Sequence, residues 1–452
     1  MKQILVLGAG QSTPYLINYL LDEAQKHKWF VTVGDLNLAN AQKAVGNHPS
    51  GSAIHFDIND AVMRSTQIKK ADVVVSMLSP IFHHLVALEC VNHGAHMVSA
   101  SYESKKIKAL DLDAHRRNLL ILNEMGLDPG IDHMSAMKLI QHVRDNDGQI
   151  SAFLSYGSGI PAPDMHCNPL RYCITWNARN ITRAGEVGAL YKEQGKIKVL
   201  AYHHVFHRTW PVEVEGVGTL EAYPNRNSLI YEELFGLDGM RTMIRGTLRY
   251  PGWSETWSQI VRLGITNDTM PIPNLNEMTY RNLLEMFLSI NVSGGKLENR
   301  AANLLQINPT GKIMENLKWL GLFEDEIIGG DVNTAADVLT NLLVKKLALP
   351  ENGRDMVILQ HEIEATYPKE NNRRERILAT MIEYGKAGKY TAMSKTVGLP
   401  GAIAVKLILT NKLPLTGCHI PTHPAIYEPV LKELKKLGLT FTEKFQEIRD
   451  EE

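Results

Sequence analysis

The sequence predicts an α/β protein whose first third is a doubly wound parallel sheet. Short apolar runs recur along this third, and segments with helical periodicity separate them. Each run is apolar almost throughout, which is typical of parallel strands buried on both faces. A glycine turn, GAGQST, follows the first run directly and leads into a helix, as in a mononucleotide-binding unit.

Six strands are expected in this sheet, with crossover helices between them. They cover Ile4–Leu7, Phe30–Val33, Ala53–Phe56, Val73–Met77, His96–Ala100 and Leu119–Leu122. This alternation describes a Rossmann-type domain. Ligands of such sheets bind at the carboxyl ends of the strands, so the residues that follow each strand are the first candidates for a site.

The glycine turn predicts a dinucleotide site. Gly8 permits the tight turn after the strand, and Gly10 lets the backbone come close to a pyrophosphate. Pro14 suits the first position of the following helix, whose positive end would point at that phosphate. Thr13 occupies the third fingerprint position, where Gly or Ala is usual.

An acid at the end of the second strand indicates the type of dinucleotide. Asp35, in VTVGDLN, could accept both ribose hydroxyls of NAD and would repel the 2′-phosphate of NADP. No arginine follows closely, so NAD is the preferred cofactor and NADP is possible. The alternative is that Asp35 only caps a turn.

Further cofactor contacts are expected from the turns that follow the strands. Asp57, after the third strand, could hydrogen-bond near the adenine or could be a solvated turn residue. The predicted cofactor contacts are Gly8, Gly10, Gln11, Ser12, Thr13, Asp35, Asp57, Ser76, Leu78 and Ser99.

The stretch NEMGLDPGIDHMSAMK, residues 123–138, leaves the carboxyl end of the sixth strand and enters an apolar-periodic helix. Asp128 could accept a proton or hold a substrate ammonium near the path of the hydride. The alternative is that Asp128 to Gly130 is a turn and Asp132 the helix N-cap. We expect His133 to be a hydrogen-bonding residue at the helix start and not a catalyst.

Length and composition limit the remaining possibilities. The 452 residues exceed one hydrophobic core, and 44% hydrophobic with 21% charged residues is ordinary for a soluble enzyme. A net charge of −1 argues against general binding to nucleic acid or membrane surfaces. The four cysteines are widely scattered and predict reduced thiols, and no apolar run approaches the about 20 residues of a membrane span. A cytoplasmic location is therefore expected.

The histidines of YHHVFH do not predict a metal site. If this segment is a strand, His203 and His204 point to opposite faces and cannot easily share one ion. No cysteine or carboxylate accompanies them at metal-ligand spacing. No metal is predicted.

Five motifs that occur in this order resemble those of saccharopine dehydrogenase of the glutamate-forming type, also called saccharopine reductase. They are SASYESKKIKALD, NEMGLDPGIDHMSAMK, SYGSGIPAPDMHCNPLRYCITWN, RGTLRYPGW and TVGLPGAIAVKLIL. The resemblance covers nearly the whole chain and is far more specific than a glycine turn.

The resemblance implies three parts. A dinucleotide-binding Rossmann domain comprises residues 1–125 and is completed by the C-terminal segment 391–452. An α+β substrate-binding and dimerisation domain with a mixed sheet comprises residues 126–265 plus 350–390, and a helical insertion covers 266–349. The residues agree, since RDMVILQHEIEATY and NNRRERILATMIEYG alternate like paired strands and AADVLTNLLVKKLAL has a helical period. A homodimer is also implied.

The implied reaction interconverts saccharopine with L-glutamate and 2-aminoadipate 6-semialdehyde by hydride transfer with a nicotinamide cofactor. Asp128 and Tyr102 are then the candidate catalytic residues, flanking the secondary amine. Arg245 could bind a carboxylate in a bidentate manner, and the alternative for Arg245 and Arg249 is a surface ion pair. The implied substrate contacts are Ser101, Tyr102, Asp128, Asn168, Arg171, Tyr172, Arg245 and Thr247.

Two departures from the family pattern bear on the substrate. Gly157 and Ser158 stand in SYGSGIPAP where the family commonly has SYCGGLPAP. The family's cysteine is replaced by Gly157, so that cysteine cannot be an indispensable catalyst in this chain. Arg171 and Cys173 stand where the family often reads NPLGYKFSW, which removes a lysine next to the expected pocket. These changes leave the nicotinamide chemistry intact and concern the choice of substrate.

Two other functions stay open. A carboxyspermidine- or homospermidine-type synthase shares the dinucleotide fold and the imine chemistry, but a diamine pocket needs acids where a polycarboxylate pocket needs bases. A non-catalytic NAD-binding regulator is the second alternative. The polar residues at the carboxyl edge of the sheet count against a regulator.

Overall fold

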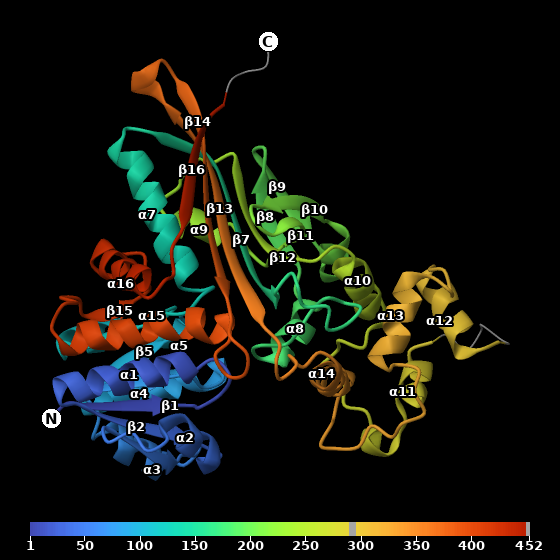
Figure 1. The fold of residues 1–452 in the computed structure, drawn as a ribbon, viewed down its shortest axis with the longest axis horizontal. Helices are drawn as coiled ribbons and strands as arrows, with labels where there is room; N and C mark the ends of the chain where they lie inside the picture. The colour runs from blue at the N-terminus through green and yellow to red at the C-terminus, as the bar shows by residue number, and fades with distance from the viewer. Residues whose placement is uncertain (289–294, 449–452) are drawn as a thin grey trace. The chain divides into compact units, whose positions relative to one another are not determined.

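The computed structural model describes residues 1–288 and 295–448 (Figure 1). The chain divides into two compact units. The first contains Met1–Ile150, Ala365–Glu375 and Met381–Glu452, and the second contains Ser151–Glu364 and Arg376–Thr380. The long strands β13 (Asp355–Tyr367) and β14 (Arg373–Tyr384) contribute residues to both units.

The first unit is built on a parallel sheet with the strand order β3-β2-β1-β4-β5-β6-β15. The pairings along this order are parallel, and the first six strands follow the order of a dinucleotide-binding fold with its switch point between β1 and β4. All six predicted strands are confirmed, with ends shifted by no more than two residues. The strands are β1 (Gln3–Leu7), β2 (Phe30–Asp35), β3 (Gly51–His55), β4 (Val73–Ser76), β5 (His96–Ser99), β6 (Leu120–Leu122) and β15 (Gly417–His419).

The helices of this unit begin where the sequence supplies suitable first residues. Pro14 opens α1, as predicted, and the Asp60 side chain accepts the N–H groups of Val62 and Met63 at the start of α3. The helices are α1 (Pro14–His27), α2 (Leu38–Val45), α3 (Ala61–Ile68), η1 (Pro80–Phe82), α4 (His83–His93), α5 (Lys105–Lys108), α6 (Asp111–Arg116), α7 (Ile131–Asp145), η4 (Pro368–Glu370), α15 (Ala392–Leu409) and α16 (Pro424–Lys436).

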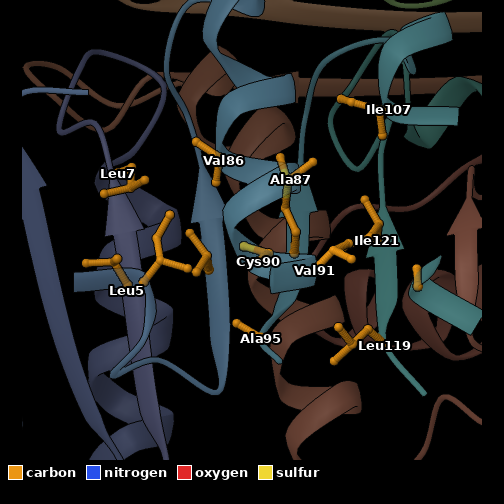
Figure 2. Close-up of a cluster of buried hydrophobic side chains, with 14 of the residues drawn as sticks. Leu5, Leu7, Val86, Ala87, Cys90, Val91, Ala95, Ile107, Leu119 and Ile121 are labelled. Atoms are coloured by element: carbon orange, nitrogen blue, oxygen red, sulfur yellow. The ribbon is translucent and has the colours of Figure 1, made fainter. Parts of the chain in front are cut away.

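One face of the sheet packs on α4 through a cluster of buried apolar side chains (Figure 2). Leu5 and Leu7 of β1 and Ile121 of β6 are at most 3% exposed, and so is Cys90 of α4. Full burial of an aliphatic side chain contributes about 1.5–3 kcal/mol, so this cluster fixes the strands whose carboxyl ends carry the candidate site.

The C-terminal segment returns to the first unit, as predicted. Strand β15 pairs in parallel with β6, with Cys418 opposite Ile121. Helix α15 packs so closely on α1 that a Cβ at Gly398 would lie 3.1 Å from the backbone nitrogen of Leu16. By length and composition α15 could cross a membrane, but 78% of it is buried, and we interpret it as a core helix.

The second sheet is mixed, as predicted. Its strand order is β10-β11-β12-β7-β13-β14-β16, and β8 joins at β12 and pairs with β9. The β12–β7 pairing is parallel, whereas β11–β12 and β10–β11 are antiparallel. The strands not yet introduced are β7 (Gln149–Pro161), β8 (Ala189–Glu193), β9 (Lys196–Leu200), β10 (Trp210–Val214), β11 (Gly218–Pro224), β12 (Thr242–Arg249) and β16 (Thr442–Glu447).

The segment predicted as a helical insertion contains the helices α11 to α14. Capping boxes at Thr279 and Thr334 begin α11 and α14. The helices of the second unit are α8 (Ala178–Ala184), η2 (Tyr202–His207), α9 (Ile230–Leu234), α10 (Trp253–Leu263), η3 (Leu275–Glu277), α11 (Tyr280–Met286), α12 (Leu297–Leu305), α13 (Lys312–Leu320) and α14 (Ala335–Lys346). Residues 289–294 of the predicted insertion and 449–452 of the predicted C-terminal segment lie outside the described residues. The predicted boundaries of the three parts stay predictions.

One local prediction is wrong. The segment YHHVFH forms the 3-10 helix η2, because its apolar residues Val205 and Phe206 are neighbours and are both buried. The argument that strand alternation separates His203 from His204 therefore fails, and their ring centroids lie 4.2 Å apart. Of the four cysteines, which are widely spaced in the sequence, Cys167 and Cys173 lie in the fold with their sulfur atoms 2.9 Å apart.

Candidate functional site

The glycine turn after β1 leaves backbone room for a phosphate. Gly8 has φ +100°, and a Cβ there would lie 2.9 Å from the carbonyl oxygen of Met77, so glycine is required. A Cβ at Gly10 would meet nothing within 4 Å, so the space next to the Gly10 backbone is open. Thr13 folds back and donates from Oγ1 to the Gly10 carbonyl oxygen at 2.8 Å. These residues form a cradle at the amino end of α1, and they fit a pyrophosphate.

Asp35 ends β2 beside this cradle. Its Oδ2 accepts the N–H of Ala9 at 2.8 Å, and its Oδ1 accepts the N–H of Asn37 at 2.8 Å. Asp35 therefore holds a turn, as the alternative prediction states. Each carboxylate oxygen keeps a further lone pair, so the same group can also accept ribose hydroxyls.

The remaining predicted cofactor contacts also lie in the first unit. Gln11 is exposed and Ser12 is half-buried in the glycine turn. Asp57 follows β3, and its Oδ1 accepts the N–H of Asn59 at 2.9 Å, as a turn residue does. Leu78 is partly buried against the apolar cluster of Figure 2.

A buried histidine that sequence reasoning did not select joins the ends of two strands. Nδ1 of His83 lies 2.8 Å from Oγ of Ser76, which ends β4, and Nε2 lies 2.8 Å from Oγ of Ser101, which follows β5. Ser99 in turn accepts the N–H of Ser101 at 3.1 Å. Burial lowers the pKa of His83 to about 4, so the ring is neutral near pH 7 and donates to only one of the two serines. His83 could have been selected from the sequence only by its position, shortly after a predicted strand and at the start of a helix.

The two predicted catalytic residues are in contact. The Tyr102 hydroxyl donates to Oδ1 of Asp128 at 3.1 Å. Tyr102 follows β5 and is 41% exposed, whereas Asp128 follows β6 and is half-buried. The N–H of Glu124 donates to the carbonyl oxygen of Ser101 at 3.1 Å and so ties the two turns together. A phenol and a carboxylate in contact can move a proton between solvent and a bound amine.

A buried ionic cluster holds the bend that carries Asp128. Nδ1 of His133 lies 2.7 Å from Oδ1 of Asp132, and Nε2 lies 3.0 Å from Oε2 of Glu124. Burial alone would lower the pKa of His133, but the two carboxylates outweigh it and raise the pKa to about 9. The cluster is therefore an imidazolium shared by two carboxylates. Each carboxylate also accepts a backbone N–H, from Gly130 at 2.6 Å and from Glu103 at 3.0 Å.

Backbone hydrogen bonds close the bend itself. The N–H of Gly126 donates to the Pro129 carbonyl oxygen at 3.0 Å, and the N–H of Ile131 donates to the Gly126 carbonyl oxygen at 2.9 Å. Gly130 has φ +148°, and a Cβ there would lie 2.0 Å from the Gly126 carbonyl oxygen. Gly130 is the N-cap of α7, so the prediction that Asp132 caps this helix is wrong; Asp132 lies in its first turn.

In the second unit, Arg249 is a buried cation among aromatic rings. Its guanidinium carbon lies 4.7 Å from the ring centroid of Tyr172, 5.0 Å from that of Trp253 and 5.9 Å from that of Tyr223. Arg249 is only 7% exposed, so the surface-ion-pair alternative is wrong. Among the described residues, its Nε atom has no hydrogen-bond partner. Its Nη1 donates to the Leu248 carbonyl oxygen at 2.8 Å. Because a buried N–H donor without a partner is costly, the Nε position suits an anionic ligand such as a carboxylate.

Two neighbouring groups repeat this pattern. Tyr172 is 0% exposed, and its hydroxyl finds no partner in the described part of the chain. The same holds for Nε of Arg171, whose guanidinium carbon lies 3.7 Å from the ring centroid of Tyr250. Asn168, in contrast, donates to the Tyr172 carbonyl oxygen at 2.7 Å and accepts its N–H at 3.3 Å. Asn168 therefore shapes the turn that presents Arg171 and Tyr172.

Arg245 and Thr247 share a face of β12 with Arg249, because alternate residues of a strand point the same way. Arg245 is 5% exposed and donates to the Tyr231 hydroxyl at 2.7 Å, so it also is no surface ion pair. Thr247 is half-buried and lies opposite Tyr223 in the neighbouring strand. Arg249, two residues beyond Thr247, was missed as a site residue although RGTLRY contains it.

The predicted substrate contacts thus fall into two groups, one in each unit. The first group is Ser101, Tyr102 and Asp128, which the hydrogen bonds above bring together. The second group is Asn168, Arg171, Tyr172, Arg245 and Thr247. Within residues 1–288 and 295–448, no cluster of three or more His, Cys, Asp or Glu side chains could hold a metal ion.

Two family descriptions match this chain. The saccharopine dehydrogenase NADP binding domain matches residues 4–122, and the saccharopine dehydrogenase C-terminal domain matches residues 126–439. The chain is 32% identical to the saccharopine dehydrogenase [NADP(+), L-glutamate-forming] of Saccharomyces cerevisiae over 98% of its length and 99% of the relative. It is 30% identical to the mitochondrial alpha-aminoadipic semialdehyde synthase of Bos taurus, covering 98% of this chain and 47% of that protein.

Solved structures that are similar to this one include two whose likeness extends over nearly the whole chain. The apo saccharopine dehydrogenase (L-Glu forming) of Saccharomyces cerevisiae superposes with a TM-score of 0.87 at 30% identity, covering 99% of this chain and 100% of the other. The homospermidine synthase of Legionella pneumophila in complex with NAD has a TM-score of 0.56 at 10% identity, covering 98% and 91%. The second likeness shows a shared fold and no more.

Proposed function

This chain belongs to the saccharopine dehydrogenase family, and we infer that it is the oxidoreductase of lysine metabolism that interconverts saccharopine with L-glutamate and 2-aminoadipate 6-semialdehyde. The family matches together cover nearly the whole chain, and both the Saccharomyces cerevisiae relative and its superposed structure are named as L-glutamate-forming saccharopine dehydrogenases.

The products define what the site must do. For the semialdehyde to form, the carbon that becomes the aldehyde loses a hydride, and the secondary amine loses a proton, which gives an imine. Water then adds to this carbon, and cleavage of its bond to nitrogen releases glutamate. The nicotinamide ring, when bound, accepts the hydride. The residues of the chain must position the carbon, accept the proton and assist the addition of water.

Asp128 and Tyr102 supply the proton acceptor in this proposal. The observation that carries it is the 3.1 Å hydrogen bond between them at the carboxyl ends of β5 and β6, where open parallel sheets bind their ligands. The carboxylate takes the amine proton, and the partly exposed phenol connects the carboxylate to solvent. The ionic cluster around His133 holds the bend, and His83 fixes the hydroxyl of Ser101 beside it.

Arg249, Arg171 and Tyr172 bind a substrate carboxylate in this proposal. Saccharopine has three carboxylates, and a chain with a net charge of −1 must hold them by local groups. The three residues offer buried N–H and O–H donors that have no partner among the described residues. A diamine substrate would place ammonium groups against these cations, so a polyamine-forming reaction is disfavoured.

The comparisons with known proteins and the residues of this chain favour different dinucleotides. A nicotinamide dinucleotide is the cofactor, and the family description and the name of the Saccharomyces cerevisiae relative favour NADP over our prediction of NAD. Asp35 is the reason we keep NAD as the proposal for this chain. Its carboxylate lies beside the phosphate cradle, and the following residues up to Lys43 contain no cation that could pair with a 2′-phosphate.

The test is an absorbance assay of saccharopine oxidation with NAD and with NADP at equal concentrations, with glutamate quantified as the product. Turnover that yields glutamate with either dinucleotide supports the reaction, and faster turnover with NAD supports the role of Asp35. Turnover of a diamine and none of saccharopine would refute the proposal. The homodimer and the cytoplasmic location stay predictions.

A further inference from the structure

Two of the four cysteines lie in contact in the segment CNPLRYC. The sulfur atoms of Cys167 and Cys173 are 2.9 Å apart, and both thiols are free. The two residues bracket the turn that contains Asn168, Arg171 and Tyr172. The sequence gives them a spacing of six residues, so only the shape of this turn brings them together.

Asn168 determines that shape. Its side chain bonds to both the carbonyl oxygen and the N–H of Tyr172, and the N–H of Arg171 donates to the Asn168 carbonyl oxygen at 3.0 Å. The ends of the turn are therefore already held together in the reduced protein. A disulfide bond is about 2.05 Å long, so the sulfur atoms need to approach by less than about 1 Å.

The two thiols differ in the way that disulfide exchange requires. Cys167 is half-buried, and the hydrogen bond from Cys173, together with the charge of Arg171, lowers its pKa to about 7. Cys173 is 1% exposed, and its contact with Cys167 and its burial raise its pKa. Because the thiolate is the nucleophile, Cys167 is the attacking sulfur and Cys173 the resolving one.

The other two cysteines provide a contrast. Cys90 is fully buried in the apolar cluster, and burial raises its pKa. Cys418 is 2% exposed, and burial raises its pKa to about 12. Neither offers an accessible thiolate near neutral pH, so they are internal controls for chemistry at Cys167.

We propose that Cys167 and Cys173 form a reversible dithiol–disulfide site that is oxidised by low-molecular-weight disulfides such as oxidised glutathione. The Cys167 thiolate attacks one sulfur of the oxidant, which forms a mixed disulfide and releases one thiolate. The Cys173 thiol loses its proton to solvent, and its sulfur attacks the sulfur of Cys167, which releases the second thiolate. The protein loses two electrons and two protons, and the oxidant becomes two thiols.

Closing this bond changes the candidate carboxylate site, a consequence that rests on the proposed function. The turn holds Arg171 against the Tyr250 ring at 3.7 Å and Tyr172 against Arg249 at 4.7 Å. A movement of the sulfur atoms shifts both residues, since they lie between the two cysteines. We expect oxidation to raise KM for saccharopine and to change kcat little.

The test equilibrates the protein in glutathione buffers of increasing oxidising strength, unfolds each sample in denaturant that contains N-ethylmaleimide to block the free thiols, and locates the label by peptide mass spectrometry. The expected result is the joint loss of label from Cys167 and Cys173, restored by dithiothreitol, while unfolded samples still show labelling of Cys90 and Cys418. C173S should accumulate a glutathione adduct at Cys167, and C167S should form none at Cys173.

If Cys167 and Cys173 stay fully labelled in the most oxidising buffer, or form only adducts and no bridge in the wild-type protein, the proposal is wrong. If the disulfide forms but KM does not change, the dithiol–disulfide site is supported and its proposed effect on substrate binding is refuted. If the disulfide forms but the protein does not oxidise saccharopine, the dithiol–disulfide site is supported and the proposed function is refuted.

Discussion

Nε2 of His133 lies 3.0 Å from Oε2 of Glu124, and both side chains are removed from solvent. Glu124 has φ +62°, a left-handed conformation that costs a side-chain-bearing residue about 1–3 kcal/mol and persists where its surroundings hold it. The ion pair supplies this restraint. It joins the residue that follows β6 to the start of α7, and Asp128 lies on the bend between them.

The His133 cluster predicts a pH-dependent stability. The folded-state pKa of about 9 exceeds the ordinary value of 6.5, so the contribution of His133 is complete below about pH 6.5 and disappears as the pH rises through 9. The shift corresponds to a contribution on the order of 3 kcal/mol. Urea unfolding from pH 6 to 10 should show this loss.

Replacement of His133 supplies the control. H133Q leaves two buried carboxylates without their cation, and we expect a loss of about 3–5 kcal/mol near pH 7 with the alkaline limb abolished. H203Q changes an exposed histidine and should leave the profile as it is. An alkaline limb that survives in H133Q would assign it to another group.

Tyr102 predicts a moderate catalytic effect. Y102F removes the hydroxyl that donates to Asp128 and leaves the ring in place. We expect kcat to fall about 10-fold, which corresponds to one hydrogen bond, with the free energy of unfolding unchanged because Tyr102 is 41% exposed. Steady-state kinetics with saccharopine measure it. An unchanged kcat would leave Tyr102 outside the proton path.

Arg249 predicts an effect on substrate binding. R249M removes the buried charge and keeps most of the apolar contact with the rings. We expect KM for saccharopine to rise about 10- to 100-fold, as for loss of a charged hydrogen bond, while the protein stays folded. R183M, at an arginine whose side chain is 54% exposed, is the matched control and should change neither constant. An unaltered KM in R249M would exclude a carboxylate at this position.

The two glycine positions predict opposite effects. G130A places a Cβ 2.0 Å from the Gly126 carbonyl oxygen. An unfavourable backbone conformation alone costs about 1–3 kcal/mol, so with this clash G130A should lower the free energy of unfolding by more than that. G10A meets nothing within 4 Å and should keep its stability, but it should weaken dinucleotide binding, because the new methyl group lies where the backbone approaches the phosphate. Thermal unfolding and dinucleotide titration distinguish these results. A stable G130A would show that the bend relaxes.

Asp35 predicts the choice of dinucleotide. The double substitution D35S/L36R removes the charge that repels a 2′-phosphate and adds one that attracts it. We expect the ratio of kcat/KM for NAD to that for NADP to fall at least about 100-fold, since each of the two changes is worth about 1.4 kcal/mol or more. A wild-type enzyme that already prefers NADP would show that Asp35 serves only its turn.

The parts of the fold that follow from local pattern were predictable. Strand positions came from apolar runs, and the glycine turn came from two residues whose space and φ requirements are local. YHHVFH failed because a short segment with apolar neighbours fits a strand and a 3-10 helix alike. Asp128 and Tyr102 were selected through their motifs, and their hydrogen bond could not be seen because β6 separates them in the chain.

The residues that were missed depend on distant partners. Arg249 became a candidate only when the rings of Tyr172 and Trp253 were seen to bury it. His83 bridges two strands whose ends meet only in the folded sheet. The contact between Cys167 and Cys173 depends on the turn that Asn168 closes, and spacing alone does not predict it.

Asp128, on the bend after β6, accepts the proton in the oxidation of saccharopine in our proposal. The pH dependence of kcat/KM, measured side by side for the wild-type enzyme and D128N, tests it most directly. We predict that D128N loses about 10²- to 10⁴-fold in kcat and loses the acidic limb of the profile. A D128N enzyme with the wild-type rate and the wild-type profile would show that Asp128 is only a turn residue.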